Sequence, residues 1–460
     1  MRKLFAPILV LCMLCSLCPA AAEKIDADTN WKIRREAAEN SQIMAVIHQL
    51  TDVYGARLTG SPDFKAACDW ALRQMENWGL ENGRLEKWDF GHPGWNNERY
   101  SVRVVSPYKD NLDARVIAWT PDTKGAVRAG AVQIAPPDRP SPEQLTAFFE
   151  SAKDKVRGRI VLVGAHTRVP VQFNPSYKRR EEADLRAQFD PVHPAPAAQP
   201  KQQPGPADGK NLLDPRQVEQ KIDEFLVENG ALAKIADAAR AHGQISVFAN
   251  RSYSTARAVP GVVIRNEDYG RMSRILAGGS PVEMEIDIRN TVYPDDTLSV
   301  NAIAEIPGSD KKREVVMLGA YIDSWHAGTG ATDNATGVAV MMEAARILKK
   351  LGVQPRRTIR VALWGGEEQG LLGSKAYVRD HFGTYESPQP DFPALSAYLN
   401  LDSGTGRIRG AFLFGPPEAA SVLRPMLEAF ADLGVAGVAA TKSRSYGGTD
   451  STSFSWAGLP

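Results

Sequence analysis

The sequence predicts an α/β fold built on a mixed, mainly parallel sheet that is flanked by helices. Three short apolar runs support this prediction, at Val315–Leu318, Thr358–Leu363 and Ala397–Leu401. Residues Val338–Ala345 have apolar side chains spaced for one face of a helix, and a second helix is expected at Leu371–Phe382. Short apolar runs that alternate with helical segments are typical of parallel strands covered by helices.

Acidic residues follow each of these runs. Asp323 and Asp333 lie on the loop after the first run, Glu367 and Glu368 follow the second, and Asp402 follows the third. In open α/β sheets, ligands bind at the carboxyl ends of the strands. Five acids gathered in a partly dry place need a cation to neutralise them. The sequence therefore predicts a metal site.

The segments around these acids resemble metallopeptidase family 28, the two-zinc exopeptidases, and within it the carboxypeptidase Q-like branch. The similarity begins at Tyr54-Gly55-Ala56-Arg57-Leu58-Thr59-Gly60-Ser61-Pro62 and extends to Gly447-Gly448-Thr449-Asp450. It implies a zinc-exopeptidase-like fold with a β-rich insert of the protease-associated type.

The resemblance also implies a role for each acid. The position of Asp333 bridges two divalent metal ions, that of Glu368 binds one of them, and that of Asp402 binds the other. Glu367 matches the general base, and Asp323 matches an acid that orients a metal-binding histidine. A carboxylate in the last role fixes the tautomer of the imidazole.

Two positions depart from the family pattern. The family has a histidine two residues before Asp323, where this chain has Tyr321, and another directly after Asp450, where it has Ser451. Both replacements offer oxygen, which suits manganese, magnesium or calcium better than zinc. We therefore expect a metallo-exopeptidase acting on peptides or dipeptides, and the alternative is a catalytically impaired relative that binds peptides or a partner.

Other residues near the site are not expected to carry its chemistry. His326 is the nearest histidine, and we expect it to lie beside the site or the substrate rather than to bind a metal. Ser451 and Ser453 lack the Gly-x-Ser-x-Gly elbow of a serine nucleophile. Gly328-Thr329-Gly330 is followed by no lysine in phosphate-loop register.

Composition and the amino terminus indicate an exported globular protein, either periplasmic or secreted. Lys+Arg 55 against Asp+Glu 54 gives no reason to expect nucleic acid or an anionic membrane as partner. Residues 1–22 have the order of a signal peptide, and lipidation at Cys18 is disfavoured by the bulky Leu17 before it. No later segment is apolar enough to span a membrane.

Cys68 is the only cysteine of the chain that remains after the signal peptide is removed, and we expect it to be buried. For the oligomeric state, a homodimer is left open.

The chain is expected to have four parts. Residues 1–22 form the signal peptide, and residues 23–110 and 291–460 form the two parts of the catalytic-type domain. Residues 111–290 form the insert, in which the Pro-, Ala- and Gln-rich stretch 190–210 is predicted to be a mobile loop. The family has a further strand and helix after the position of Pro460, so we expect the second part to be truncated.

Several elements are predicted from local pattern alone. Apolar spacing predicts helices at Arg34–Val53, Pro62–Trp78 and Gly230–His242. Further strands are expected at Gly158–Gly164 and Leu298–Ile306.

Overall fold

The computed structural model describes residues 25–171, 173, 180–190, 211–294, 297–402, 404 and 406–460. The predicted signal peptide and nearly all of the predicted mobile loop lie outside these residues. No helix in the described ranges has the length and apolar character needed to cross a bilayer. The chain divides into two compact units, one holding residues 25–40, 180–190 and 406–446 and the other holding the rest of the described residues.

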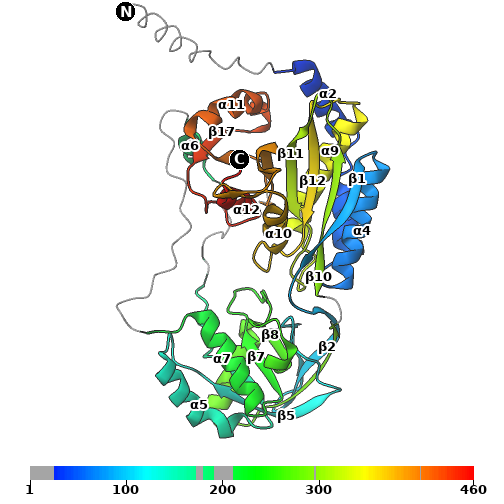
Figure 1. Ribbon diagram of the computed structural model, residues 1–460. Coiled ribbons are helices and arrows are strands. Elements are labelled where there is room, and N and C mark those ends of the chain that lie inside the picture. Colours follow the sequence, from blue (N-terminus) through cyan, green and yellow to red (C-terminus); the bar gives the residue numbers. More distant parts are fainter. Residues whose placement is uncertain are drawn as a thin grey trace, which may run out of the picture. The chain divides into compact units, whose positions relative to one another are not determined.

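The larger unit contains two large sheets (Figure 1) and a short antiparallel pair, β13 (Gly383–Thr384) and β14 (Ser387–Pro388). The first sheet consists, in spatial order, of β1 (Glu81–Asp89), β10 (Leu298–Ile306), β12 (Arg357–Trp364), β11 (Lys311–Tyr321) and β15 (Leu395–Asn400). β11 pairs in parallel with β12 and β15, whereas β10 pairs antiparallel with β1 and β12. The sheet is therefore mixed, as predicted, but it is not mainly parallel, because two of its four strand pairings are antiparallel. Its parallel strands lie together in the half that carries the acids.

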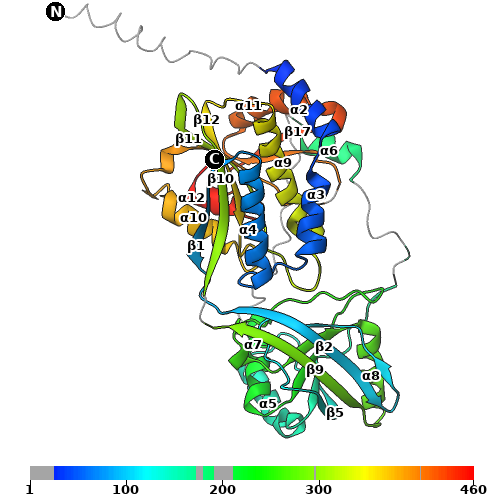
Figure 2. The ribbon, with the colours of Figure 1, turned by 90° about the vertical axis from the view of Figure 1, so that its right-hand side faces the viewer.

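Helices cover both faces of the first sheet. The helices α3 (Ile43–His48), α4 (Pro62–Asn77) and α9 (Thr336–Lys350) cover one face, as Figure 2 shows. The helices α10 (Leu372–His381) and α12 (Ser451–Ala457) lie on the other. Side chains alternate between the two faces along each strand, because successive residues of a strand point in opposite directions. Leu318 and Ala320 thus pack under α9, and Met317 and Tyr321 pack towards α10 and α12.

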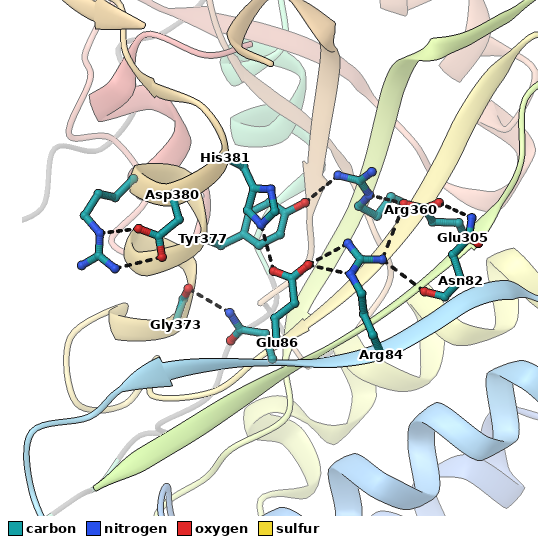
Figure 3. Close-up of polar contacts among 11 residues, drawn as sticks. Asn82, Arg84, Glu86, Glu305, Arg360, Gly373, Tyr377, Asp380 and His381 are labelled. Carbon is teal, nitrogen blue, oxygen red and sulfur yellow. Dashed lines mark hydrogen bonds and ion pairs between the residues drawn. The ribbon is translucent and has the colours of Figure 1, made fainter. Parts of the chain in front are cut away.

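Polar contacts fasten α10 to this sheet (Figure 3). Arg360 of β12 donates to Glu305 of β10 at 2.6 Å and to the hydroxyl of Tyr377 at 2.6 Å. His381 at the end of α10 contacts Glu86 of β1 at 3.0 Å. Because α10 begins four residues after Glu368, these contacts also fix the turn that carries the glutamates.

The second sheet has the strand order β3-β2-β9-β5-β6-β7-β8-β4. Its strands are β2 (Gly94–Ser106), β3 (Asp110–Asn111), β4 (Ala114–Val116), β5 (Val127–Ile134), β6 (Ile160–Val163), β7 (Ala233–Asp237), β8 (Gly261–Ile264) and β9 (Glu283–Tyr293). The helices of this region are α5 (Pro142–Val156), α7 (Pro215–Glu228) and α8 (Asn266–Ala277). The sheet thus includes β2, which precedes the predicted insert, and β9, which crosses the boundary of that insert at residue 290.

The smaller unit is built around two parallel strands. β16 (Gly410–Phe414) and β17 (Gly437–Thr441) pair in register, and α11 (Pro417–Glu428) connects them. The same unit contains α2 (Ala27–Glu39) and α6 (Glu182–Gln188). This unit contains none of the predicted site residues.

Two local predictions are wrong. The segment Gly230–His242 is not a helix, because β7 lies between β6 and β8 and pairs with both in parallel. Its alanines favour a helix locally, but pairing with neighbouring strands overrides that preference. The predicted helix Arg34–Val53 is interrupted after Glu39, since the N–H of Asn40 closes α2 and a new helix starts at Ile43. Cys68 is buried within α4, as predicted.

Candidate active site

Three parallel strands bring the predicted site residues to one edge of the first sheet. Tyr321 at the end of β11 lies opposite Trp364 at the end of β12, and Gly319 lies opposite Asn400 at the end of β15. The strands therefore finish at nearly the same level. The acids that follow them by two to four residues enter the same region, as the sequence predicts.

Asp323 anchors the turn that carries both glutamates. Its carboxylate is fully buried and accepts hydrogen bonds from the hydroxyl of Thr59 at 3.0 Å and from the backbone N–H groups of Glu367 at 3.2 Å and Glu368 at 3.3 Å. Burial raises the pKa of Asp323 to about 6, although these hydrogen bonds oppose the rise. Its partners in the structure are thus a hydroxyl and a backbone turn.

Tyr321 connects two other acids. Its hydroxyl lies 2.6 Å from Asp402 and also hydrogen-bonds Asp333. The side chain of Asn334 donates to the carbonyl of Leu401 at 2.9 Å, which holds the two acid-bearing loops together. A phenol has a single proton, so it can neutralise at most one of two carboxylates by donating. The other carboxylate needs a proton or a cation.

The electrostatic environment of the acids is unfavourable to negative charge. Burial, reinforced by the neighbouring acids, raises the pKa values of Glu367 and Glu368. Burial likewise raises the pKa of Asp402. Asp450, just before α12, is fully buried, and neither of its oxygens has a hydrogen-bond partner of good geometry. Such a cluster is costly without a compensating positive charge.

The donors have the negative charge and the oxygen atoms that suit a divalent cation. They lack the nitrogen donors that zinc favours. The candidate ligands are oxygens of Asp333, Glu368 and Asp402, with the hydroxyls of Tyr321 and Ser451 at the histidine positions of the family pattern. Across the described ranges, no three His, Cys, Asp or Glu side chains are already arranged as a metal site. The acids converge, and Tyr321 stands between two of them.

Arg57 ties the amino-terminal motif to the loops of the site. Its guanidinium is fully buried, and burial lowers its pKa to about 10. It donates to five backbone carbonyls, those of Leu50, Gly55, Ile322, Thr329 and Gly330. The backbone N–H and C=O of Arg57 bond Ser324 as well. One side chain therefore fixes the segment before Asp323 and the loop before Asp333.

His326 and the serines have other partners. The Nε2 of His326 lies 2.6 Å from the carbonyl of Val116, and its ring packs edge-on against Trp95. Ser453 shares a hydrogen bond of 2.8 Å with Ser374, and Ser451 is the first residue of α12. These contacts leave His326 directed towards the second sheet.

Sequence reasoning missed several residues that support the site. Arg57 and Thr59 lie in the amino-terminal motif, and Thr449 and Asp450 lie in the carboxyl-terminal motif. The two motifs could therefore have pointed to these residues. Asn400 lies in an ordinary strand pattern. Its contact with Thr449, at 3.2 Å, becomes visible only in the fold.

Comparison with known proteins identifies relatives in sequence. Residues 301–460 match the model of peptidase family M28. Carboxypeptidase Q of Mus musculus is 25% identical over 418 residues, which cover 89% of this chain and 74% of that protein. Leupeptin-inactivating enzyme 1 of Streptomyces exfoliatus is 33% identical over 160 residues, which cover 35% of this chain and 34% of that protein.

Solved structures agree in fold. A peptidase M28 precursor from Shewanella amazonensis SB2B superposes with a TM-score of 0.62 at 22% identity, covering 93% of this chain and 85% of that one. BSAP, a zinc aminopeptidase from Bacillus subtilis, gives a TM-score of 0.54 at 18% identity, covering 91% and 82%. The family model over residues 301–460 and the carboxypeptidase Q relatives support peptidase family M28, in its carboxypeptidase Q-like branch, and a peptidase activity for this chain, and the solved structures agree with its fold.

Proposed function

We propose that this chain is an exported metallo-exopeptidase that hydrolyses peptides or dipeptides with a divalent cation held entirely by oxygen. The observation that carries the proposal is the convergence of acids from β11, β12, β15 and the loop before α9 at one sheet edge. Sequence relatives named carboxypeptidase and aminopeptidase support attack at a chain end. The signal-like residues 1–22 support export.

Asp333, Glu368 and Asp402 would hold the cation, with Tyr321 and Ser451 as the remaining oxygen donors. Bound there, a divalent cation would polarise the scissile carbonyl and activate a water for attack. The oxygen set favours manganese, magnesium or calcium. In this proposal the site holds two such ions, the number in the family pattern.

Glu367 would accept the proton of the attacking water. Its backbone N–H is held by Asp323, so the side chain starts from a fixed turn. Asp323 itself is held by Thr59 and would act as a positioning residue for both glutamates. A base fixed in this way does not have to be ordered when substrate binds.

The direct test is hydrolysis by the purified mature protein. Apo protein prepared with a chelator should release free amino acids from dipeptides only after Mn²⁺, Mg²⁺ or Ca²⁺ is returned. Hydrolysis that persists unchanged in the chelated protein would rule out the metal mechanism. Absence of hydrolysis with every cation, for a folded protein, would favour the peptide-binding alternative.

A further inference from the structure

A row of polar side chains lies behind Asp402, on the face of the first sheet that α12 covers. The indole Nε1 of Trp364 is 2.7 Å from the hydroxyl of Tyr398, and this hydroxyl is 2.6 Å from Oδ1 of Asn400. The Nδ2 of Asn400 is 3.2 Å from the hydroxyl of Thr449. The Thr449 hydroxyl lies close enough to Asp402 to lower the pKa of its carboxyl, against the effect of burial. The hydrogen bonds therefore run from a strand interior to Thr449, which lies beside a candidate ligand.

The chemistry of each group gives the row a direction. An indole N–H can only donate, so the Tyr398 oxygen accepts from Trp364 and its own proton is directed to Asn400. An amide oxygen can only accept, so Oδ1 of Asn400 faces the tyrosine and Nδ2 faces Thr449. The Thr449 oxygen then accepts from the amide, and its proton is left for Asp402. Each hydrogen bond fixes the orientation of the next group.

Packing holds the middle of the row in place. The ring of Tyr398 stacks on Phe454 of α12, with 3.8 Å between centroids and 12° between planes. On the adjacent strand β11, a Cβ at Gly319 would come within 2.2 Å of the Tyr398 hydroxyl. Glycine at this position is what allows the hydroxyl to reach the line between Trp364 and Asn400. The phenol therefore has little freedom to turn away.

We propose that this directed row of hydrogen bonds orients the carboxylate of Asp402 for cation binding, so that Trp364, Tyr398, Asn400 and Thr449 are positioning residues. This inference rests on the proposed function, in which Asp402 is a ligand. A carboxylate already held by a fixed donor has less freedom to lose when it binds a cation. Loss of such an outer partner typically lowers metal affinity about 10- to 100-fold.

The test is calorimetric titration of Mn²⁺ into apo protein, with variants that change single atoms. Thr449→Val removes the last hydroxyl and should weaken binding about 10- to 100-fold. Thr449→Ser keeps the hydroxyl and should bind like the unaltered protein. Tyr398→Phe keeps the stacked ring but breaks the row in its middle, and it should also weaken Mn²⁺ binding.

The double variant Tyr398→Phe with Thr449→Val separates a connected row from two local effects. If the row is connected, the double variant should bind no more weakly than Thr449→Val alone, because the last bond is already lost. Additive losses would contradict the connection. Since Tyr398→Phe retains the stacking, normal Mn²⁺ affinity in that variant would overturn the inference even if Thr449→Val did not fold.

The outcomes distinguish this inference from the proposed function. If the unaltered protein binds Mn²⁺ and both Tyr398→Phe and Thr449→Val bind it equally well, the positioning role is wrong while the metallopeptidase stands. If the unaltered protein binds none of the tested cations, the proposed function is contradicted and the inference falls with it.

Discussion

The hydroxyl of Tyr321, the last residue of β11, lies 2.6 Å from the carboxylate of Asp402, two residues after β15. The resemblance to the family implies a histidine where this tyrosine stands. A phenol is longer than an imidazole and reaches the acid directly, so it occupies space between Asp402 and Asp333. This contact is the main reason to expect an oxygen-only cation site.

Restoring the two imidazoles should change the metal preference. The double variant Tyr321→His with Ser451→His adds two nitrogen donors, which zinc favours. We expect zinc affinity to rise by more than about tenfold, since even outer partners of a metal change affinity by this much. Tyr321→Phe, which removes the hydroxyl without adding nitrogen, is the matched control and should not gain zinc affinity. Equal zinc binding by the restored and unaltered proteins, measured by calorimetry, would contradict this prediction.

Replacing the proposed base should separate chemistry from binding. Glu367→Gln keeps the size of the side chain but cannot accept a proton, so kcat for dipeptide hydrolysis should fall by about 100- to 10,000-fold. Cation affinity should stay nearly constant. Glu418→Gln, at an exposed position of α11, is the control and should keep full activity. A Glu367→Gln enzyme with unchanged kcat would remove this residue from the mechanism.

Removing the guanidinium of Arg57 should destabilise the larger unit. Arg57→Met would leave five backbone carbonyls without their donor, and we expect a loss of about 3–5 kcal/mol in the free energy of unfolding. Arg379→Met removes an exposed arginine paired with Asp380 and should cost less than about 1 kcal/mol. Urea unfolding of the two variants measures the difference. Similar midpoints for both would show that Arg57 does not hold the loops.

His326 should make the fold sensitive to acid. Burial lowers its pKa from 6.5 to about 4, although the hydrogen bond that Nε2 donates to the carbonyl of Val116 opposes this shift, and Nδ1 is buried without a partner. In the unfolded chain His326 binds a proton near pH 6.5. Above that pH, neutral His326 therefore makes its full contribution to the free energy of unfolding. This contribution is lost as the pH falls towards 4.

The size of this effect is on the order of 3 kcal/mol. A His326→Gln variant should therefore lose less stability than the unaltered protein between pH 6.5 and 4. His242→Gln, at an exposed position, should follow the unaltered protein. Parallel pH profiles of urea unfolding for all three proteins would show that His326 does not titrate in this range.

The order of strands, loops and acids around the site was predictable because a short stretch of sequence determines each of these elements. The strand Leu298–Ile306 and the helix α9 follow the apolar spacing, and the acids come where each strand ends. The segment Ala233–Asp237 was not predictable in this way, because its strand depends on pairing with β6 and β8. Local preference fails where neighbours in space decide the structure.

The contacts within the site were less predictable than its residues. Asp323 was identified from the sequence, but its partner Thr59 lies 264 residues away along the chain. The link from Trp364 to Tyr398 depends on two separate strands and on the space left by Gly319. No periodicity in the sequence reports such contacts, which become visible only when the strands are side by side.

Metal content measures the central claim most directly. Protein purified without added metal should be analysed by elemental analysis, and its apo form should then be titrated calorimetrically with Mn²⁺, Mg²⁺, Ca²⁺ and Zn²⁺. The oxygen-only site at Asp333, Glu368 and Asp402 predicts modest, stoichiometric binding of at least one of the first three. Tight stoichiometric zinc without binding of the others, or no metal at all, would contradict it.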